Sequence, residues 1–139
     1  MAEDENVTLR CEVSGELHAV LVRIHNNEVG VLRKPITKAE ILLRVVELAL
    51  AYPTYKYDTN RYGKDAKGSY NCTILVSEEL WTNTSIDFKN HNFVRGKTPF
   101  FRTALALGCA YYEDHTGPPG FRRSIRSMLP APGDPKPAG

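Results

Sequence analysis

Apolar and polar residues alternate strictly along two stretches of the chain. The first covers residues 7–13, and its apolar positions are Val7, Leu9, Cys11 and Val13. The second covers residues 70–77, and its apolar positions are Tyr70, Cys72, Ile74 and Val76. A period of two residues is typical of a strand that buries one face. The pattern therefore predicts two half-buried strands.

Three further segments have weaker strand signals. Residues 17–25 are apolar on both faces of the alternation, as a central strand covered on both sides would be. The polar run "HNNEVG" then predicts a turn, and Val29 and Val31 predict a short third strand. Residues 85–94 are the third and weakest candidate.

A capping pattern predicts the first helix. Thr37 is followed three residues later by Glu40, the spacing in which each side chain can bond the other residue's backbone N–H. Apolar residues then recur at helical spacing until Pro53, which cannot continue a helix. We expect a helix over residues 38–51 that supplies much of the core.

A second helix is predicted to begin after Thr98, which would serve as its N-cap, with Pro99 at the first helical position. It should end near His115. Gly108 stands in its middle, where glycine destabilises a helix by roughly 1 kcal/mol relative to alanine. The glycine therefore predicts close packing of this helix against another backbone.

These elements follow one another in the order β-β-β-α-β-β-α. The sequence thus predicts an α+β fold, with a mainly antiparallel sheet of about five strands covered by two main helices. A single domain is expected over residues 1–120. Residues 121–139 form a basic amphipathic segment followed by a flexible, Pro-rich C-terminal tail.

Charge is distributed unevenly although the net charge is only +2. Residues 1–50 contain eight Asp and Glu against six Lys and Arg, whereas residues 51–139 contain eight against twelve. A basic second half favours an anionic partner, but the excess is small for a dedicated nucleic-acid-binding protein. No apolar run reaches the ~18 residues of a membrane span. We expect an intracellular protein, cytoplasmic or peripheral to a membrane, and not secreted.

The three cysteines offer the one route to an enzyme. Cys109 or Cys72 could act as a nucleophile with a histidine as base, the candidates being His18, His25, His91 and His115. Both cysteines, however, lie on apolar faces, which is typical of core thiols. No cysteine or histidine spacing fits a zinc site, and no nucleotide-binding motif is present. The sequence therefore predicts no enzyme, no cofactor and no metal.

The segment "GFRRSIRSML" is a candidate surface for a membrane or a nucleic acid. If it is helical, Phe121 and Ile125 lie on one face, and Arg122, Arg123 and Arg126 lie largely off it. A short basic amphipathic stretch can lie on anionic lipid or along phosphates. The alternative is a C-terminal helix that docks Phe121 and Ile125 on its own domain and leaves the arginines in solvent.

A second candidate is the loop between residues 58 and 68. Tyr55 and Tyr57 share one face of a short predicted strand before it, as in an ordinary half-buried strand. The loop itself is predicted to be exposed and to form a modest electrostatic contact loop, with the residues Arg61, Tyr62, Lys64 and Lys67.

Residues 72 to about 125 resemble the C-terminal part of a rhabdovirus-type matrix protein. The features that carry the resemblance are, in order, the strand "CTILVSEEL", a polar connection, the helix "FFRTALALGCAYYED" and a final "FRRSI". The resemblance implies a compact α+β core and a small viral structural protein. Such proteins usually start with a basic arm and often contain a PPxY motif. This chain starts with "MAEDEN" and has "PPGF" at 118–121, so membrane attachment would come from Arg122, Arg123 and Arg126.

The leading hypothesis is a non-catalytic, matrix-like protein that self-associates as a homo-oligomer and bridges an anionic membrane and a nucleocapsid. One alternative is a single-stranded nucleic-acid-binding viral accessory protein, such as an RNA-silencing suppressor, in which tyrosines stack on bases. The other alternative is a small enzyme with a cysteine nucleophile.

Overall fold

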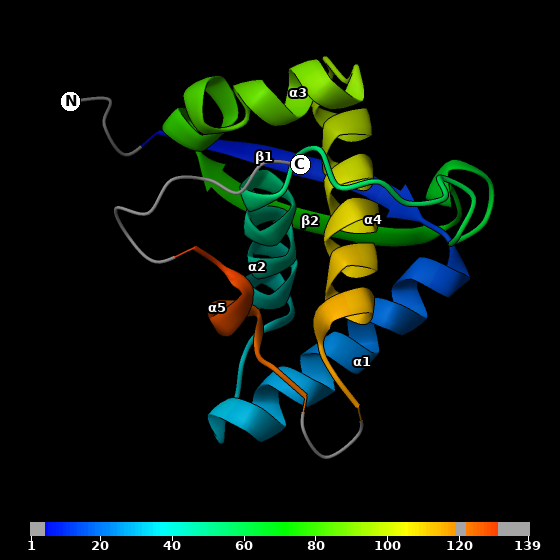
Figure 1. Cartoon of the computed structure of the whole chain (residues 1–139). Helices are drawn as coiled ribbons and strands as arrows, with labels where there is room; N and C mark the ends of the chain where they lie inside the picture. Colours follow the sequence, from blue (N-terminus) through cyan, green and yellow to red (C-terminus); the bar gives the residue numbers. More distant parts are fainter. Residues whose placement is uncertain (1–4, 119–121, 131–139) are drawn as a thin grey trace.

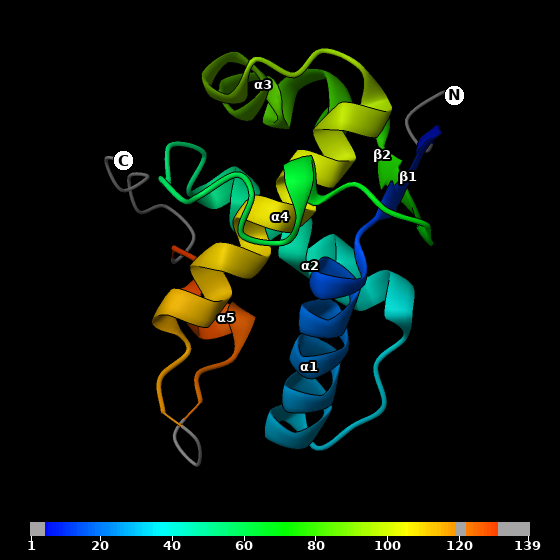
Figure 2. The ribbon, with the colours of Figure 1, turned by 90° about the vertical axis from the view of Figure 1, so that its right-hand side faces the viewer.

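The computed structural model describes residues 5–118 and 122–130. Its elements in chain order are β1 (Asn6–Val13), α1 (Gly15–Leu32), α2 (Lys38–Ala51), the 3₁₀ turn η1 (Lys64–Ala66), β2 (Tyr70–Ser77), the π-helical turn η2 (Leu80–Thr84), α3 (Ile86–Asn92), α4 (Lys97–His115) and α5 (Ile125–Met128). The two strands form one antiparallel sheet with α2 and α4 against it (Figure 1). Figure 2 shows the strands at one margin of the molecule, with α3 above and α1 below.

The two alternating stretches are strands, as predicted. β1 and β2 pair along their whole length, from Asn6 opposite Ser77 to Val13 opposite Tyr70. Every second residue is buried from Leu9 to Val13 and from Cys72 to Val76, because one face of the sheet packs against helices and the other faces solvent. At the ends of the predicted apolar faces, Val7 is half-buried and Tyr70 is exposed.

The predicted strands at 17–25 and at Val29 and Val31 are wrong, because both segments belong to α1. The helix begins at Ser14, whose hydroxyl oxygen accepts a hydrogen bond from the backbone N–H of Leu17 at 3.0 Å. Its buried positions are Leu17, Val20, Leu21, Ile24 and Glu28. They recur every three or four residues, which is the helical period. Packing of this face overrides the strand preference of the β-branched residues.

The strand predicted at residues 85–94 is also wrong, since most of it is the helix α3. Residues 54–58, which hold Tyr55 and Tyr57, form no strand, although both tyrosines are half-buried as expected. The fold is α+β, but the predicted sheet of about five strands under two main helices is contradicted. Among the described residues the sheet has two strands, and further helices surround it.

Both predicted main helices are present. Thr37 caps α2 by accepting a hydrogen bond from the backbone N–H of Glu40 at 3.1 Å, and the helix ends at Ala51 as predicted. α4 ends at His115 as predicted, but its N-cap is Gly96, not Thr98.

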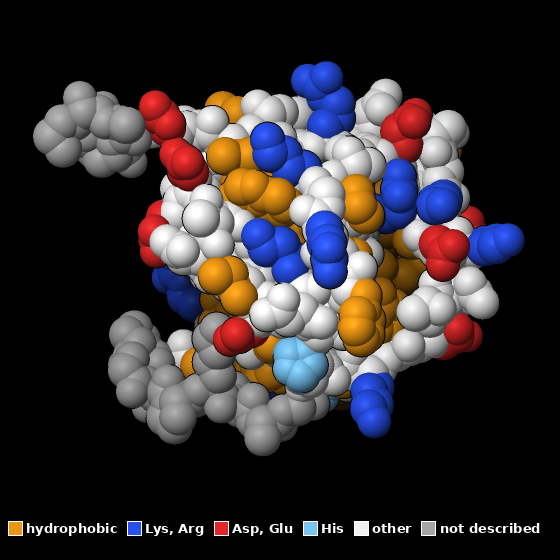
Figure 3. Space-filling model, turned by 90° about the horizontal axis from the view of Figure 1, so that it is seen from above, with side chains coloured by type: hydrophobic (Ala, Val, Ile, Leu, Met, Phe, Trp, Pro, Cys, Tyr) orange, Lys and Arg blue, Asp and Glu red, His pale blue; other side chains and the backbone are white. Residues whose placement is uncertain are grey.

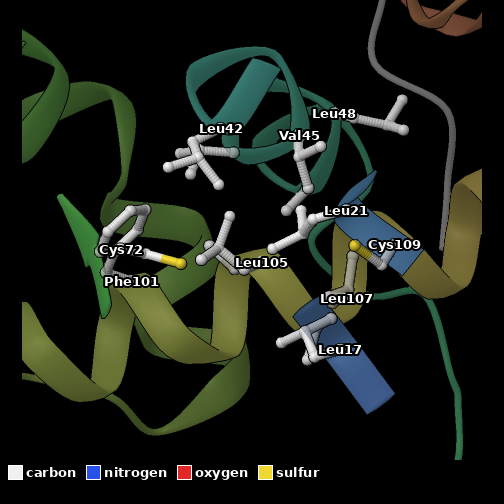
Figure 4. Close-up of a cluster of buried hydrophobic side chains, with 14 of the residues drawn as sticks. Leu17, Leu21, Leu42, Val45, Leu48, Cys72, Phe101, Leu105, Leu107 and Cys109 are labelled. Carbon is white, nitrogen blue, oxygen red and sulfur yellow. The ribbon is translucent and has the colours of Figure 1, made fainter. Parts of the chain in front are cut away.

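The core lies where α4 crosses α2. Figure 4 shows Leu42 and Val45 of α2 pointing toward Leu105 of α4, with Phe101 beside Cys72 of the sheet. At the crossing, a Cβ atom added to Gly108 would lie 2.3 Å from the backbone oxygen of Val45. Glycine is therefore needed for the two helices to approach this closely, and the close packing predicted from Gly108 is confirmed.

Gly108→Ala should destabilise the fold by about 2 kcal/mol or more, because the backbone of α2 must move to accept a methyl group. The matched control is Gly30→Ala in α1, where an added Cβ atom meets nothing within 4 Å. That variant should gain up to about 1 kcal/mol from helix propensity. Urea unfolding of both variants measures the difference, and equal effects would contradict the close crossing.

Candidate functional site

The predicted contact loop is held against the C-terminal end of α4. Tyr62 was expected to be exposed, but its side chain is 4% exposed. Its hydroxyl donates a hydrogen bond of 2.5 Å to the Glu113 carboxylate, which also receives Arg23 of α1 at 2.9 Å. Tyr62 is therefore unavailable for stacking on a base, because α4 and its acidic end enclose it.

Arg61 is neutralised in the same cluster. Its guanidinium donates two hydrogen bonds to Asp114, at 2.9 and 3.1 Å, and lies 3.3 Å from Glu113. The hydrogen bond from Arg61 is the largest cause that lowers the pKa of Asp114. Lys64 and Lys67 remain exposed. Lys64 and Lys67 are thus the exposed cations of the predicted contact loop, whereas Arg61 attaches the loop to α4.

Aromatic rings from the same region form a packed column on α4. Tyr111 stacks between Tyr52 and His115, with ring centroids 4.1 and 4.0 Å away. Tyr55 contacts Tyr111 and His115 edge-on, at 5.1 and 5.6 Å. The tyrosines between residues 51 and 62 therefore pack on one another or on α4.

The basic C-terminal segment is docked on the domain. Ile125 and Met128 are buried against the core, and α5 contacts α2. The backbone N–H of Ile125 donates to the Glu28 carboxylate at 3.2 Å. Ile125 is therefore not a membrane contact in this structure, because its side chain fills the core. This arrangement matches the docked alternative; Phe121 lies outside the described residues.

The three arginines of this segment differ in their surroundings. All three are exposed, but the guanidinium of Arg123 donates to the backbone oxygen of Ser127 at 2.9 Å. Arg122 also lines a groove of about 400 Å³ between α1 and α4, which contains the Arg23–Glu113 ion pair. The residues that line the groove include no cysteine and no histidine, so it lacks the groups expected for the predicted thiol chemistry.

The candidate nucleophiles are buried. Cys72 lies opposite Cys11 in the sheet, and both thiols are free, as is that of Cys109. Burial raises the pKa of Cys109 well above its ordinary value. A hydrogen bond from Cys11 to Cys72 raises the pKa of Cys11 and lowers that of Cys72. Both candidate nucleophiles, Cys72 and Cys109, are nevertheless buried, and a thiol that no substrate can reach is a poor nucleophile.

Three of the four candidate histidine bases contact groups other than a cysteine. His25 bonds the backbone oxygen of Ile36 at 2.6 Å, and His115 bonds that of Tyr111 at 2.8 Å. His18 stacks on Tyr70. No cysteine–histidine hydrogen bond, no group of three metal-binding side chains and no helix able to cross a bilayer occurs within residues 5–118 and 122–130.

The structure shows a surface that the sequence did not indicate. Phe93, directly after α3, is 91% exposed and has φ 56°, in the left-handed region. Its N–H and that of Val94 both bond the backbone oxygen of Lys89, and Val94 is buried. The left-handed turn therefore buries Val94 and leaves the Phe93 ring in solvent.

Cations flank this ring. Arg95 and Lys97 are exposed, and neither makes an ion pair or hydrogen bond within the described part of the chain. Lys89 is occupied, since its ammonium donates to the backbone oxygen of Trp81 and lies 4.1 Å from the centroid of that ring. Figure 3 views the molecule from the α3 end and shows Lys and Arg side chains interspersed with apolar ones. We name Phe93, Arg95 and Lys97 the Phe93 surface.

No sequence pattern identified this surface, because a spacing of five residues places Phe88 and Phe93 on different faces of a helix and of a strand alike. Phe88 is buried, and Phe93 falls between the polar residues 90–92 and Arg95.

No protein-family model, no curated protein and no solved structure matches the chain. The resemblance to rhabdovirus-type matrix proteins therefore stays a prediction.

The three native thiols should resist iodoacetamide in the folded protein and react after unfolding in urea, because all of them are buried. Mass spectrometry of each cysteine before and after unfolding measures this. Rapid modification of Cys109 or Cys72 in the native state would revive the hypothesis of a cysteine nucleophile.

Glu28→Gln should stabilise the protein increasingly as the pH rises. Burial raises the pKa of Glu28, and one of its oxygens has no hydrogen-bond partner among the described residues. When the pKa of a carboxyl group is higher in the folded than in the unfolded state, its contribution to the free energy of unfolding is fully present below the unfolded-state pKa. This contribution is lost as the pH rises through the folded-state pKa. Glutamine has no such loss.

Urea midpoints between about pH 5 and about pH 8 measure this difference. The matched control is Glu40→Gln. Glu40 is an exposed acid whose carboxylate lies 3.9 Å from the guanidinium of Arg44, the same distance as that of Glu28. Its effect should be small at every pH. A difference between Glu28→Gln and wild type that does not change with pH would contradict the raised pKa.

Proposed function

We propose that the chain is a non-catalytic, matrix-like interaction protein that lies on an anionic membrane and connects it to a nucleocapsid. The observation that carries the proposal is the Phe93 surface. An apolar ring held in solvent beside two cations that have no ion pair within residues 5–118 and 122–130 matches the chemistry of a lipid headgroup region, which offers anionic groups above an apolar layer.

The backbone at Phe93 supports a role other than folding. A bulky residue in the left-handed region costs about 1 kcal/mol or more, and glycine or asparagine would avoid much of this cost. The Phe93 ring adds little packing energy to the domain, since it is almost fully exposed. Strain of this kind is typical of functional positions.

The local charge fits an anionic partner. Residues 86–102 contain the four cations Lys89, Arg95, Lys97 and Arg102 against the single acid Asp87. Each Lys or Arg near an anionic leaflet is worth about 1 kcal/mol, and burial of a phenylalanine about 2 kcal/mol. Phe93, Arg95 and Lys97 would together give about 4 kcal/mol, a dissociation constant of roughly 1 mM. One copy would therefore attach weakly, as expected of a protein that acts in an assembly.

The second partner would bind at the other end. Arg122 and Arg126 are exposed on and near α5, which lies away from α3 (Figure 1). Two separate basic surfaces suit a protein that bridges two anionic structures, here lipid and the phosphates of a nucleocapsid.

The two alternatives have less support. Binding of single-stranded nucleic acid by stacking would need several exposed tyrosines. Tyr62 is buried, however, and the exposed ring of Tyr70 already stacks on His18. Arg61, which could bind a phosphate, is paired with acids. A cysteine enzyme would need an accessible thiol.

Phe93→Asn should weaken binding to phosphatidylserine-rich vesicles about tenfold or more, because the ring can no longer enter the apolar layer. The same variant should raise Tm by about 4 °C, because asparagine tolerates the left-handed backbone. Vesicle flotation and thermal unfolding measure the two effects. Opposite changes in binding and stability would separate a functional residue from a structural one.

The matched control is Val31→Asn, which replaces an exposed apolar residue of α1 and should leave flotation unchanged. Arg95→Glu with Lys97→Glu should abolish flotation at low salt. Wild-type protein that does not float, or Phe93→Asn that floats like wild type, would contradict the membrane contact at Phe93. Loss of flotation only in Arg122→Glu with Arg126→Glu would move the contact to α5.

A further inference from the structure

The two edges of the sheet differ in what covers them. On β1, the backbone oxygens of Arg10 and Glu12 point away from β2 and accept hydrogen bonds from α4. Thr98 donates its hydroxyl to Arg10 at 3.0 Å, and Arg102 donates its Nε–H to Glu12 at 2.8 Å. The second half of the β1 edge is thus occupied by α4, and its exposed side chains there, Arg10 and Glu12, are charged.

The register identifies the backbone groups on the other edge. The N–H of Glu78 donates to the backbone oxygen of Glu5 at 3.2 Å and extends the ladder by one pair. Residues of β2 at even positions therefore bond to β1, and those at odd positions point outward. The outward set is Asn71, Thr73, Leu75 and Ser77. No further strand pairs with them in the part of the chain that the structure describes.

β2 also lacks the residues that usually protect such an edge. Its eight residues contain no Lys, Arg, Asp, Glu or Pro, and it has no bulge in its pairing with β1. Leu75 is 60% exposed on the outer face. An uncharged edge strand of this length readily pairs with another strand.

We infer that β2 pairs antiparallel with β2 of a second copy of this chain, so that the two sheets join into one. The sequence of the strand is self-complementary about Leu75. In that register the Leu75 side chains of the two copies lie side by side, and Thr73 of each copy lies opposite Ser77 of the other. Leucine pairs and hydroxyl pairs both stabilise neighbouring strands, and no charges oppose each other.

The inference gives a structural basis for the assembly invoked in the proposed function and for the self-association of the leading hypothesis, and its functional meaning rests on that proposed function. Each dimer would carry two Phe93 surfaces. Two weak contacts on one particle bind much more tightly than one, because the second contact is intramolecular.

The test uses the full chain without lipid. We expect wild-type protein to form a dimer that dissociates on dilution, measured by size-exclusion chromatography with light scattering. Leu75→Lys should raise the dimer dissociation constant roughly tenfold or more, because leucine burial is lost and two lysines come together.

The matched control is Thr8→Lys. Thr8 lies directly opposite Leu75 in the register and is exposed on the same outer face, but its backbone is on the opposite edge of the sheet, the edge that α4 bonds at Arg10 and Glu12. Thr8→Lys should therefore dimerise like wild type. A dimer formed face to face would be disrupted by both substitutions, and this outcome would overturn pairing at the edge.

A crosslinking experiment checks the register. The native thiols are buried, so a short bismaleimide should link Leu75→Cys into dimers and leave Thr8→Cys monomeric. Circular dichroism establishes that each variant is folded. A wild-type chain that is monomeric at every concentration, or a Leu75→Lys variant that dimerises with the dissociation constant of wild type, would overturn the inference. Vesicle binding by a monomer would leave the membrane contact standing, so the two proposals can fail separately.

Discussion

The close crossing of α2 and α4 is the contact on which the other parts of the structure depend. Gly108 allows the α4 backbone to reach the carbonyl of Val45, and the two helices then form a continuous layer against the sheet. α5 packs on α2, and both strands pack on this helix layer. A shift of one helix relative to the other would therefore move the sheet and the C-terminal segment together.

α4 positions both charged regions of the molecule. Near its N-terminal end it receives the turn that holds the Phe93 surface and covers the edge of β1 through Thr98 and Arg102. At its C-terminal end, Glu113 and Asp114 bind Arg61. The acids thus neutralise cations at one end and leave Arg95 and Lys97 unpaired at the other. The difference decides which basic region is free to meet an anionic partner.

The parts of the fold that could be predicted are those with a local physical signature. Both strands were evident from alternation, α2 from its capping residues, and the tight helix crossing from Gly108. α1 was missed because Val20, Val22 and Ile24 favour strands in isolation. The same apolar run also fits a helix, in which Leu17 and Leu21 share one face, so periodicity alone does not separate the two structures. Only the packing of the finished core decides between the two readings.

The candidate site was harder to predict than the fold. Arg61 and Tyr62 were identified as an exposed pair, but their partners Glu113 and Asp114 are distant in sequence, and no pattern places them together. Phe93 was missed because its exposure follows from a left-handed turn anchored by Val94, which is set by tertiary packing. Contacts between residues that are distant in sequence thus determine which of the candidate side chains are exposed.

The pairing of β1 with β2 also sets the order in which the protein can form. β1 ends at Val13, and its partner begins at Tyr70. During synthesis, α1 and α2 leave the ribosome before β2 does, so β1 has no strand to pair with until β2 has been made. Pairing of strands so far apart must overcome the entropy of closing a long loop, which slows folding. We therefore expect helix formation to precede sheet formation, and the N-terminal strand to be the segment most in need of protection in the nascent chain.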